Sequence, residues 1–150
     1  MSIKIVSNAF KQGEMIPLKY TCNGENISPQ ISWRLQSDNK KIKSFALVLD
    51  DPDAPNGDWV HWVVFDIPAE KTEITENEII KDQCGIGKNS WGKNEYGGPC
   101  PSSATHRYFF RIYALDTLLV SGETTTKDML MKTMKGHVLD SGELMGKYSK

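Results

Sequence analysis

The chain reads SFALVLDDPDAP at residues 44–55, an apolar run that ends abruptly in three acids and two prolines. Consecutive apolar residues followed by turn residues predict a strand that is buried on both faces. Aspartate and proline favour turns, because proline fixes φ and aspartate hydrogen-bonds nearby backbone. The sequence therefore predicts a buried strand whose end carries a stiff, negatively charged turn.

Other segments of the chain also have the composition of strands. β-Branched and aromatic residues dominate residues 3–7, 59–67 and 105–115. Stretches rich in Gly, Pro, Asn and Ser separate them, and the one at 85–103 is long enough to indicate a functional loop. We expect a mainly β protein, an antiparallel sheet or sandwich, in one domain over residues 1–150.

A single helix is predicted within residues 124–136, near 126–135. Threonines can cap its start, Asp128 lies in its first turn and Gly136 can end it. The residues expected on its packed face are Met129, Leu130 and Met134.

Two histidines interrupt the apolar rows of the predicted strands. Alternation places His61 in a row with Trp59, Val63, Phe65 and Ile67. It places His106 in a row with Tyr108, Phe110 and Ile112. Arg107 and Arg111 fall on the opposite face, where we expect salt bridges or snorkelling side chains.

Polar residues are therefore expected to meet where the charged turn leaves the sheet. This holds if the three strands are neighbours whose ends align. The residues concerned are Asp51, Asp53, His61, His106 and Tyr108. Their convergence would explain why charge follows a buried strand.

Composition excludes several classes of function. The 18 Lys and Arg residues against 19 Asp and Glu residues give a net charge of −1, so no global field favours nucleic acid or an anionic membrane. No run approaches the roughly 20 apolar residues of a membrane span, and the first residues lack a leader pattern. We expect a cytoplasmic protein with no integral membrane segment.

The cysteines form no recognisable pattern. Cys22, Cys84 and Cys100 are odd in number and have no CxxC spacing. This argues against a disulfide framework and a zinc site, and predicts three free thiols.

Three separated motifs resemble the phosphatidylethanolamine-binding protein family, in particular its short bacterial YbhB/YbcL branch of Raf-kinase-inhibitor-like proteins. They are LVLDDPDAP, WVHWVVFDIP and YGGPCPSSATHRYFFRIYALD, and the ending MKTMKGHVLDSGELMGKY resembles the branch's C-terminal helix and final strand. The resemblance covers the whole chain. It implies a Greek-key β-sandwich with a few short peripheral helices, and a binding protein rather than an enzyme.

The resemblance also implies a pocket for phosphate, phosphorylethanolamine or a related small anion, with no cofactor. The matching positions are Asp51, Asp53, His61, Gly98, Pro99, His106 and Tyr108. It further implies a cis bond between Ala54 and Pro55. The loop departs from the family's usual GPCPPSGTHRY, because Ser102 replaces a proline and Ala104 a glycine.

The chemistry of these residues suits an anion. Two imidazoles and a phenol supply donors, and backbone N–H groups of the Tyr-Gly-Gly-Pro turn can form an anion nest. An aspartate is an unusual wall for an anion. We therefore expect Asp51 to fix a histidine tautomer or to bind an ammonium, and Asp53 to support the turn.

Other functions stay open. A hydrolase could use Ser102 or Ser103 with His106 and Asp51, although no GxSxG motif is present. A metal site could use Asp51, Asp53, His61 and His106. By resemblance, the protein could instead inhibit a kinase or protease partner, and we expect a homodimer.

Overall fold

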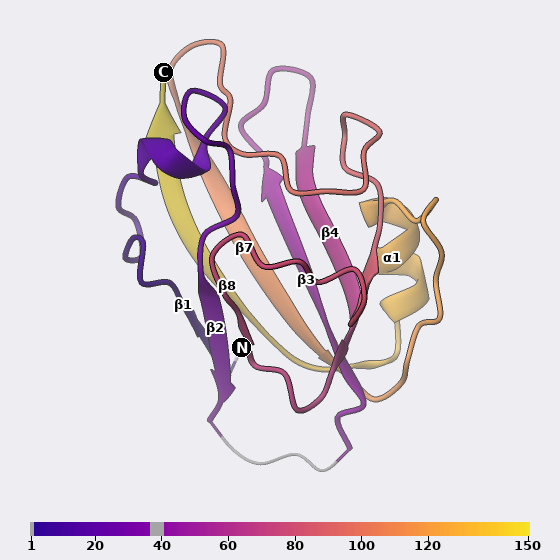
Figure 1. The fold of residues 1–150 in the computed structure, drawn as a ribbon. Helices are drawn as coiled ribbons and strands as arrows, with labels where there is room; N and C mark the ends of the chain where they lie inside the picture. The colour runs from indigo at the N-terminus through magenta and orange to yellow at the C-terminus, as the bar shows by residue number, and fades with distance from the viewer. Residues whose placement is uncertain (1, 37–40) are drawn as a thin grey trace.

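The computed structural model describes residues 2–36 and 41–150 (Figure 1). Its elements are β1 (Ile3–Val6), the 3₁₀ turn η1 (Leu18–Tyr20), β2 (Ile31–Leu35), β3 (Ser44–Asp51), β4 (Trp59–Pro68), β5 (Glu73–Ile74), β6 (Gly85–Ile86), β7 (Thr105–Leu115), α1 (Lys127–Met134) and β8 (Val138–Ser149).

The strands form two antiparallel sheets. One has the order β1-β2-β5 and the other β6-β4-β3-β7-β8. In the larger sheet β7 returns beside β3 after β4 and β6, which is the Greek-key order. The predicted antiparallel sandwich is confirmed. β2 has no counterpart among the predicted strands.

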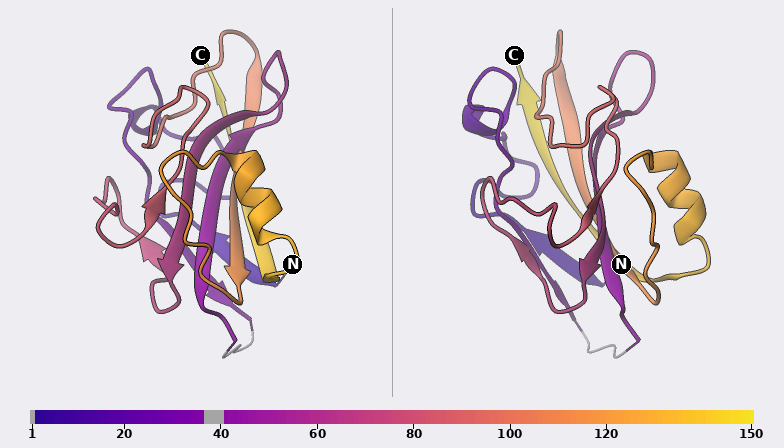
Figure 2. Two further views of the ribbon diagram at one scale, coloured as in Figure 1. Left: turned by 90° about the vertical axis from the view of Figure 1, so that its right-hand side faces the viewer. Right: turned by 45° about the vertical axis from the view of Figure 1, so that its right-hand side comes forward.

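Three layers result, with the five-stranded sheet in the middle. Figure 2 shows α1 on one face of this sheet and the smaller sheet on the other. The main core lies between the sheets, where Phe45, Leu47 and Leu49 point. Ala46 and Val48 face a second cluster beneath α1. All eight residues of β3 are therefore buried, as the apolar run predicted.

Two irregularities in β4 change its predicted faces. Leu49 lies opposite Trp62 but Asp50 lies opposite Val60, so His61 is the extra residue of a β-bulge. A second shift lies between Phe45 and Leu47. The predicted single row is therefore wrong: Val63 and Phe65 pack beneath α1, whereas Ile67 packs between the sheets and the His61 ring contacts Tyr108.

The alternation of β7 is confirmed. Tyr108, Phe110 and Ile112 pack between the sheets. Arg107 and Arg111 lie on the other face, where they form ion pairs with acids of neighbouring segments.

The predicted helix is also confirmed, with one change to its packed face. The Thr126 side chain caps its first turn, and Gly136 follows its end with φ of 85°. Leu130 and Met134 are buried, but Met129 is 48% exposed because it points away from the sheet.

Candidate functional site

A cavity of about 210 Å³ lies where β3 ends and where β4 and β7 begin. Its lining residues are Asp51, Ala54, Pro55, Trp59, His61, Trp91, Cys100, Pro101, Ser102, His106 and Tyr108. Hollows of about 280, 370 and 420 Å³ lie elsewhere on the described surface, but none is lined by a histidine. Its histidines therefore distinguish this cavity, not its size.

Asp51 and His106 form a buried pair at the base of the site. The Nδ1 atom of His106 lies 2.6 Å from Oδ2 of Asp51, and both residues are less than a tenth exposed. The other carboxylate oxygen of Asp51 accepts the backbone N–H of Asp53 at 2.8 Å. Asp51 thus orients the imidazole, which was one of its two expected roles.

His61 is held by the loop that crosses above β4. Its Nδ1 atom lies 2.7 Å from the carbonyl oxygen of Gly97, and its own carbonyl accepts the Gly97 N–H at 3.0 Å. The ring is also edge-on to Tyr108 and Trp91, with centroids 5.3 Å and 5.1 Å away. Burial lowers the pKa of His61, although the Gly97 carbonyl opposes this effect.

Tyr108 brings an unsatisfied polar atom to the cavity. Its side chain is fully buried, and its hydroxyl has no hydrogen-bond partner within the described part of the chain. Burial raises the pKa of this hydroxyl. A buried hydroxyl without a partner is costly, and a bound ligand would remove that cost.

Aromatic rings form the outer wall, and sequence reasoning did not assign them to the site. Trp59 and Trp91 meet edge-to-face with centroids 5.5 Å apart, and both are partly exposed. Trp91 belongs to the long loop that was predicted to be functional. Nothing in its local sequence indicated that it would fold against His61.

Asp53 lies outside the cavity. Its carboxylate accepts three hydrogen bonds from Arg107, one from the backbone and two from the guanidinium, each at 2.9 Å. These bonds hold the pKa of Asp53 at about 2. The four residues of the alternative metal site are therefore not all in one place, because Asp53 lies outside the cavity. Among residues 2–36 and 41–150, no group of three His, Cys, Asp or Glu side chains could hold a metal ion.

Gly98 and Pro99 lie behind the cavity wall. The Gly98 N–H donates to Asn26 Oδ1 at 2.8 Å, and a Cβ on Gly98 would lie 2.2 Å from the Tyr20 carbonyl oxygen. The Gly97 N–H donates to the His61 carbonyl, so the N–H groups of Gly97 and Gly98 both have acceptors within the protein. The predicted anion nest is therefore not formed, and Gly98 serves close packing instead.

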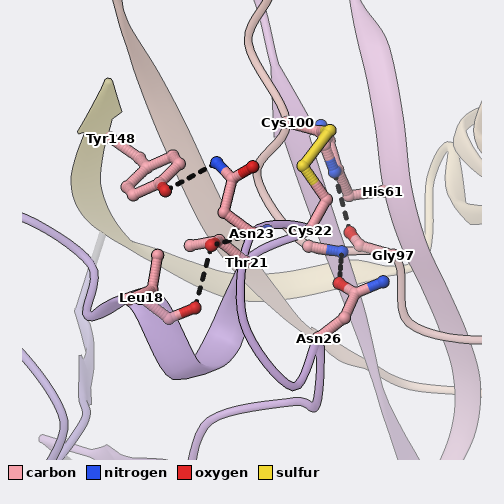
Figure 3. The surroundings of a disulfide bond; sticks show 10 residues. Leu18, Thr21, Cys22, Asn23, Asn26, His61, Gly97, Cys100 and Tyr148 are labelled. Carbon is pink, nitrogen blue, oxygen red and sulfur yellow. Dashed lines mark hydrogen bonds between the residues drawn. A yellow bond between two sulfur atoms is a disulfide. The ribbon is translucent and has the colours of Figure 1, made fainter. Parts of the chain in front are cut away.

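The prediction of three free thiols is wrong. Cys22 and Cys100 form a disulfide that joins the loop after η1 to the cavity wall (Figure 3). The Cys22 N–H also donates to the Pro99 carbonyl at 3.1 Å. The partners are 78 residues apart, so local spacing could not reveal them. Cys84 stays reduced, and burial raises its pKa to about 11.

Two further expectations concern the same loops. The Ala54–Pro55 bond is trans, so the expected cis bond is not formed. Ser102 lines the cavity with Asp51 and His106, as the hydrolase alternative requires. However, among the hydrogen bonds of the described residues, none joins Ser102 or Ser103 to His106.

Comparison with known proteins identifies the family. The sequence pattern of the family described as phosphatidylethanolamine-binding protein matches residues 6–149. The chain belongs to the phosphatidylethanolamine-binding protein family. A UPF0098 protein of Methanothermobacter thermautotrophicus is 44% identical, over 97% of this chain and 98% of its own.

Solved structures agree with this family and with the fold. A putative phosphatidylethanolamine-binding protein homologue from Chlamydia trachomatis is 39% identical, with a TM-score of 0.92 over 99% of this chain and 98% of its own. YbcL of E. coli, described as a member of the mammalian family, is 27% identical with a TM-score of 0.90, over 100% of this chain and 99% of its own. Within residues 2–36 and 41–150, the structure contains no helix with the length and hydrophobicity of a membrane span.

Proposed function

We propose that the cavity binds a small anion of the phosphate class, such as inorganic phosphate or the head group of phosphorylethanolamine. The observation that carries this proposal is the buried Tyr108 hydroxyl, which has no partner among the described residues and belongs to a ring that contacts two histidine rings. Phosphate oxygens accept hydrogen bonds from such donors. Family membership supports the same class of ligand.

Asp51 sets the orientation of one imidazole in this site. Because Asp51 takes the Nδ1 side of His106, the Nε2 atom is left for the ligand. A small cavity with few polar groups and a tryptophan rim fits a compact head group. The ligand-binding residues proposed here are Asp51, His61, His106 and Tyr108.

Calorimetric titration with inorganic phosphate and with phosphorylethanolamine tests the proposal. His106→Ala should weaken binding by about 1.5–3 kcal/mol, the range for hydrogen bonds to charged groups. His137→Ala is the matched control, because His137 pairs with Asp116 away from the cavity and is half-exposed. Unchanged affinity in His106→Ala, or no binding to the wild type, would refute the anion site.

Partner binding is a separate proposal that rests on the family alone. A kinase or protease partner would contact the surface around the cavity, and Trp59 and Trp91 are exposed there. A pull-down with and without saturating phosphate would show whether ligand modulates such a contact. The proposed homodimer is tested by light scattering, where the mass of a single chain would exclude it.

A further inference from the structure

The hydrogen-bond geometry of His61 determines what its outer nitrogen can do. A carbonyl oxygen only accepts, so the Nδ1 atom that faces Gly97 carries a proton. The residue is 2% exposed, and burial lowers its pKa, which keeps the ring neutral near pH 7. The Nε2 atom then has a lone pair and no proton. It has no hydrogen-bond partner within the described residues.

The charged and titratable groups around His61 do not change this assignment. Asp51 faces it from the end of β3 and favours the charged ring, as does the more distant Asp50. The carbonyls of Gly97 and Gly98 act in the same direction. Burial outweighs all of them, so the net direction is towards the neutral form.

Tyr108 has the opposite hydrogen-bonding character. Its ring lies 5.3 Å from that of His61. Burial keeps the Tyr108 hydroxyl protonated at neutral pH, and within the described residues it has no hydrogen-bond partner, so its proton is available to a ligand. The cavity is therefore lined by a donor, the Tyr108 hydroxyl, and by an acceptor, the Nε2 atom of His61.

Resting on the proposed anion site, we infer that the cavity selects phosphate-class anions that still carry a P–O–H proton. Tyr108 donates to one ligand oxygen, and the Nε2 atom of His61 accepts the proton of another. An anion without any proton cannot donate to the Nε2 atom. Its oxygen lone pair would face the Nε2 lone pair and the negative charge of Asp51, and both contacts are repulsive. The ligands favoured are hydrogen phosphate and singly protonated phosphomonoesters, and sulfate is disfavoured.

This selection has a pH signature that a simple cationic pocket lacks. A phosphomonoester loses its last proton with a pKa near 6. Inorganic phosphate keeps at least one P–O–H proton throughout the neutral range. Above pH 6, affinity for phosphorylethanolamine should therefore fall about tenfold per pH unit, while affinity for inorganic phosphate stays nearly constant.

The first experiment uses the unmodified protein. Calorimetric titration at pH 7 should give phosphate an affinity about tenfold or more above that of sulfate. Titration of phosphorylethanolamine between pH 6.5 and 8.5 should show the predicted decline. Equal binding of phosphate and sulfate would overturn the inference and leave the anion site standing, whereas binding of neither would overturn both.

Two variants test whether His61 is responsible for the selection of phosphate over sulfate. His61→Ala should bring the phosphate-to-sulfate ratio close to one, because the acceptor is gone. Tyr108→Phe is the matched control, since losing the donor should weaken both anions together and leave the ratio unchanged. The ¹⁵N NMR shifts of the His61 ring in the wild type should report the neutral tautomer with its proton on Nδ1. A tautomer protonated on Nε2, or an imidazolium at pH 7, would overturn the inference without any variant.

Discussion

Asp50 and Asp51 are adjacent in the chain, but they lie on opposite sides of the five-stranded sheet and have different kinds of partner. Asp50 is 1% exposed and bonds Arg111 and Lys127, at 3.1 Å and 2.6 Å. Asp51 is 3% exposed and bonds one histidine beside a cavity. Two cations neutralise the first acid, whereas the second has a single imidazole as its partner.

The two sides are also held together in different ways. On the helix side the charges continue into a network, because Arg111 also bonds Glu143 and Lys127 also bonds Asp58. Burial alone would lower the pKa of Lys127, but its hydrogen bonds to Asp50 and Asp58 leave it raised. On the cavity side a disulfide and backbone hydrogen bonds hold the wall. On the helix side the charged side chains have hydrogen-bond partners. On the cavity side, hydrogen-bonding groups are left free for a ligand.

The largest effect should come from the bond that holds the cavity wall. The double variant Cys22→Ser/Cys100→Ser should lower the free energy of unfolding in urea by about 2–5 kcal/mol, since it releases a long loop in the unfolded chain. It should also weaken phosphate binding, because Cys100 lines the cavity. Cys84→Ser is the control and should leave affinity unchanged. A variant with full stability would show that the backbone bonds alone hold the wall.

Breaking the helix-side network should affect stability without affecting the site. Lys127→Met removes one partner of the buried Asp50 and should cost about 3 kcal/mol in urea unfolding. Phosphate affinity should stay within about twofold, because Lys127 does not reach the cavity. Lys132→Met, on an exposed position of the same helix, should change neither quantity. If Lys127→Met weakened phosphate binding strongly, the two sides would be coupled rather than separate.

The free energy of unfolding below pH 6.5 should reveal that His61 is neutral in the folded protein. Since burial lowers the folded-state pKa of His61, the unfolded chain takes up a proton first as pH falls below about 6.5. The free energy of unfolding should therefore fall by up to about 1 kcal/mol between pH 6.5 and 5.5.

A variant tests the contribution of His61. His61→Gln should show a shallower pH dependence than the wild type. Identical slopes for wild type and His61→Gln would mean that His61 is not held neutral.

Regular patterns in the sequence predicted the two central strands that carry the residues compared here. The apolar run of residues 44–50 and the alternation of residues 105–115 gave β3 and β7, and with them the placement of His106 and Tyr108. β2 was missed because its ISWRL segment is short and contains Ser32 and Arg34.

Irregular features could not be predicted in the same way. Strict alternation fails at the bulge that turns His61 towards Tyr108, and no local signal indicates that a residue will be extra in its strand. In the turn after β3, spacing does not say which acid points inward, so Asp51 and Asp53 were assigned together. The disulfide joins loops that only the folded sheet brings near each other.

Asp53 provides the smallest expected effect and the sharpest test of which acid belongs to the site. Its pKa of about 2 means that its contribution to stability is present above about pH 4 and is lost as pH falls towards 2. At neutral pH, Asp53→Asn should leave phosphate affinity within about twofold, because its partner is the half-exposed Arg107 outside the cavity. Asp51→Asn should change affinity clearly more, since it removes the charge beside His106. Equal losses in the two variants would place both acids in one functional unit, and would show that the Arg107 pair positions the turn that carries Asp51.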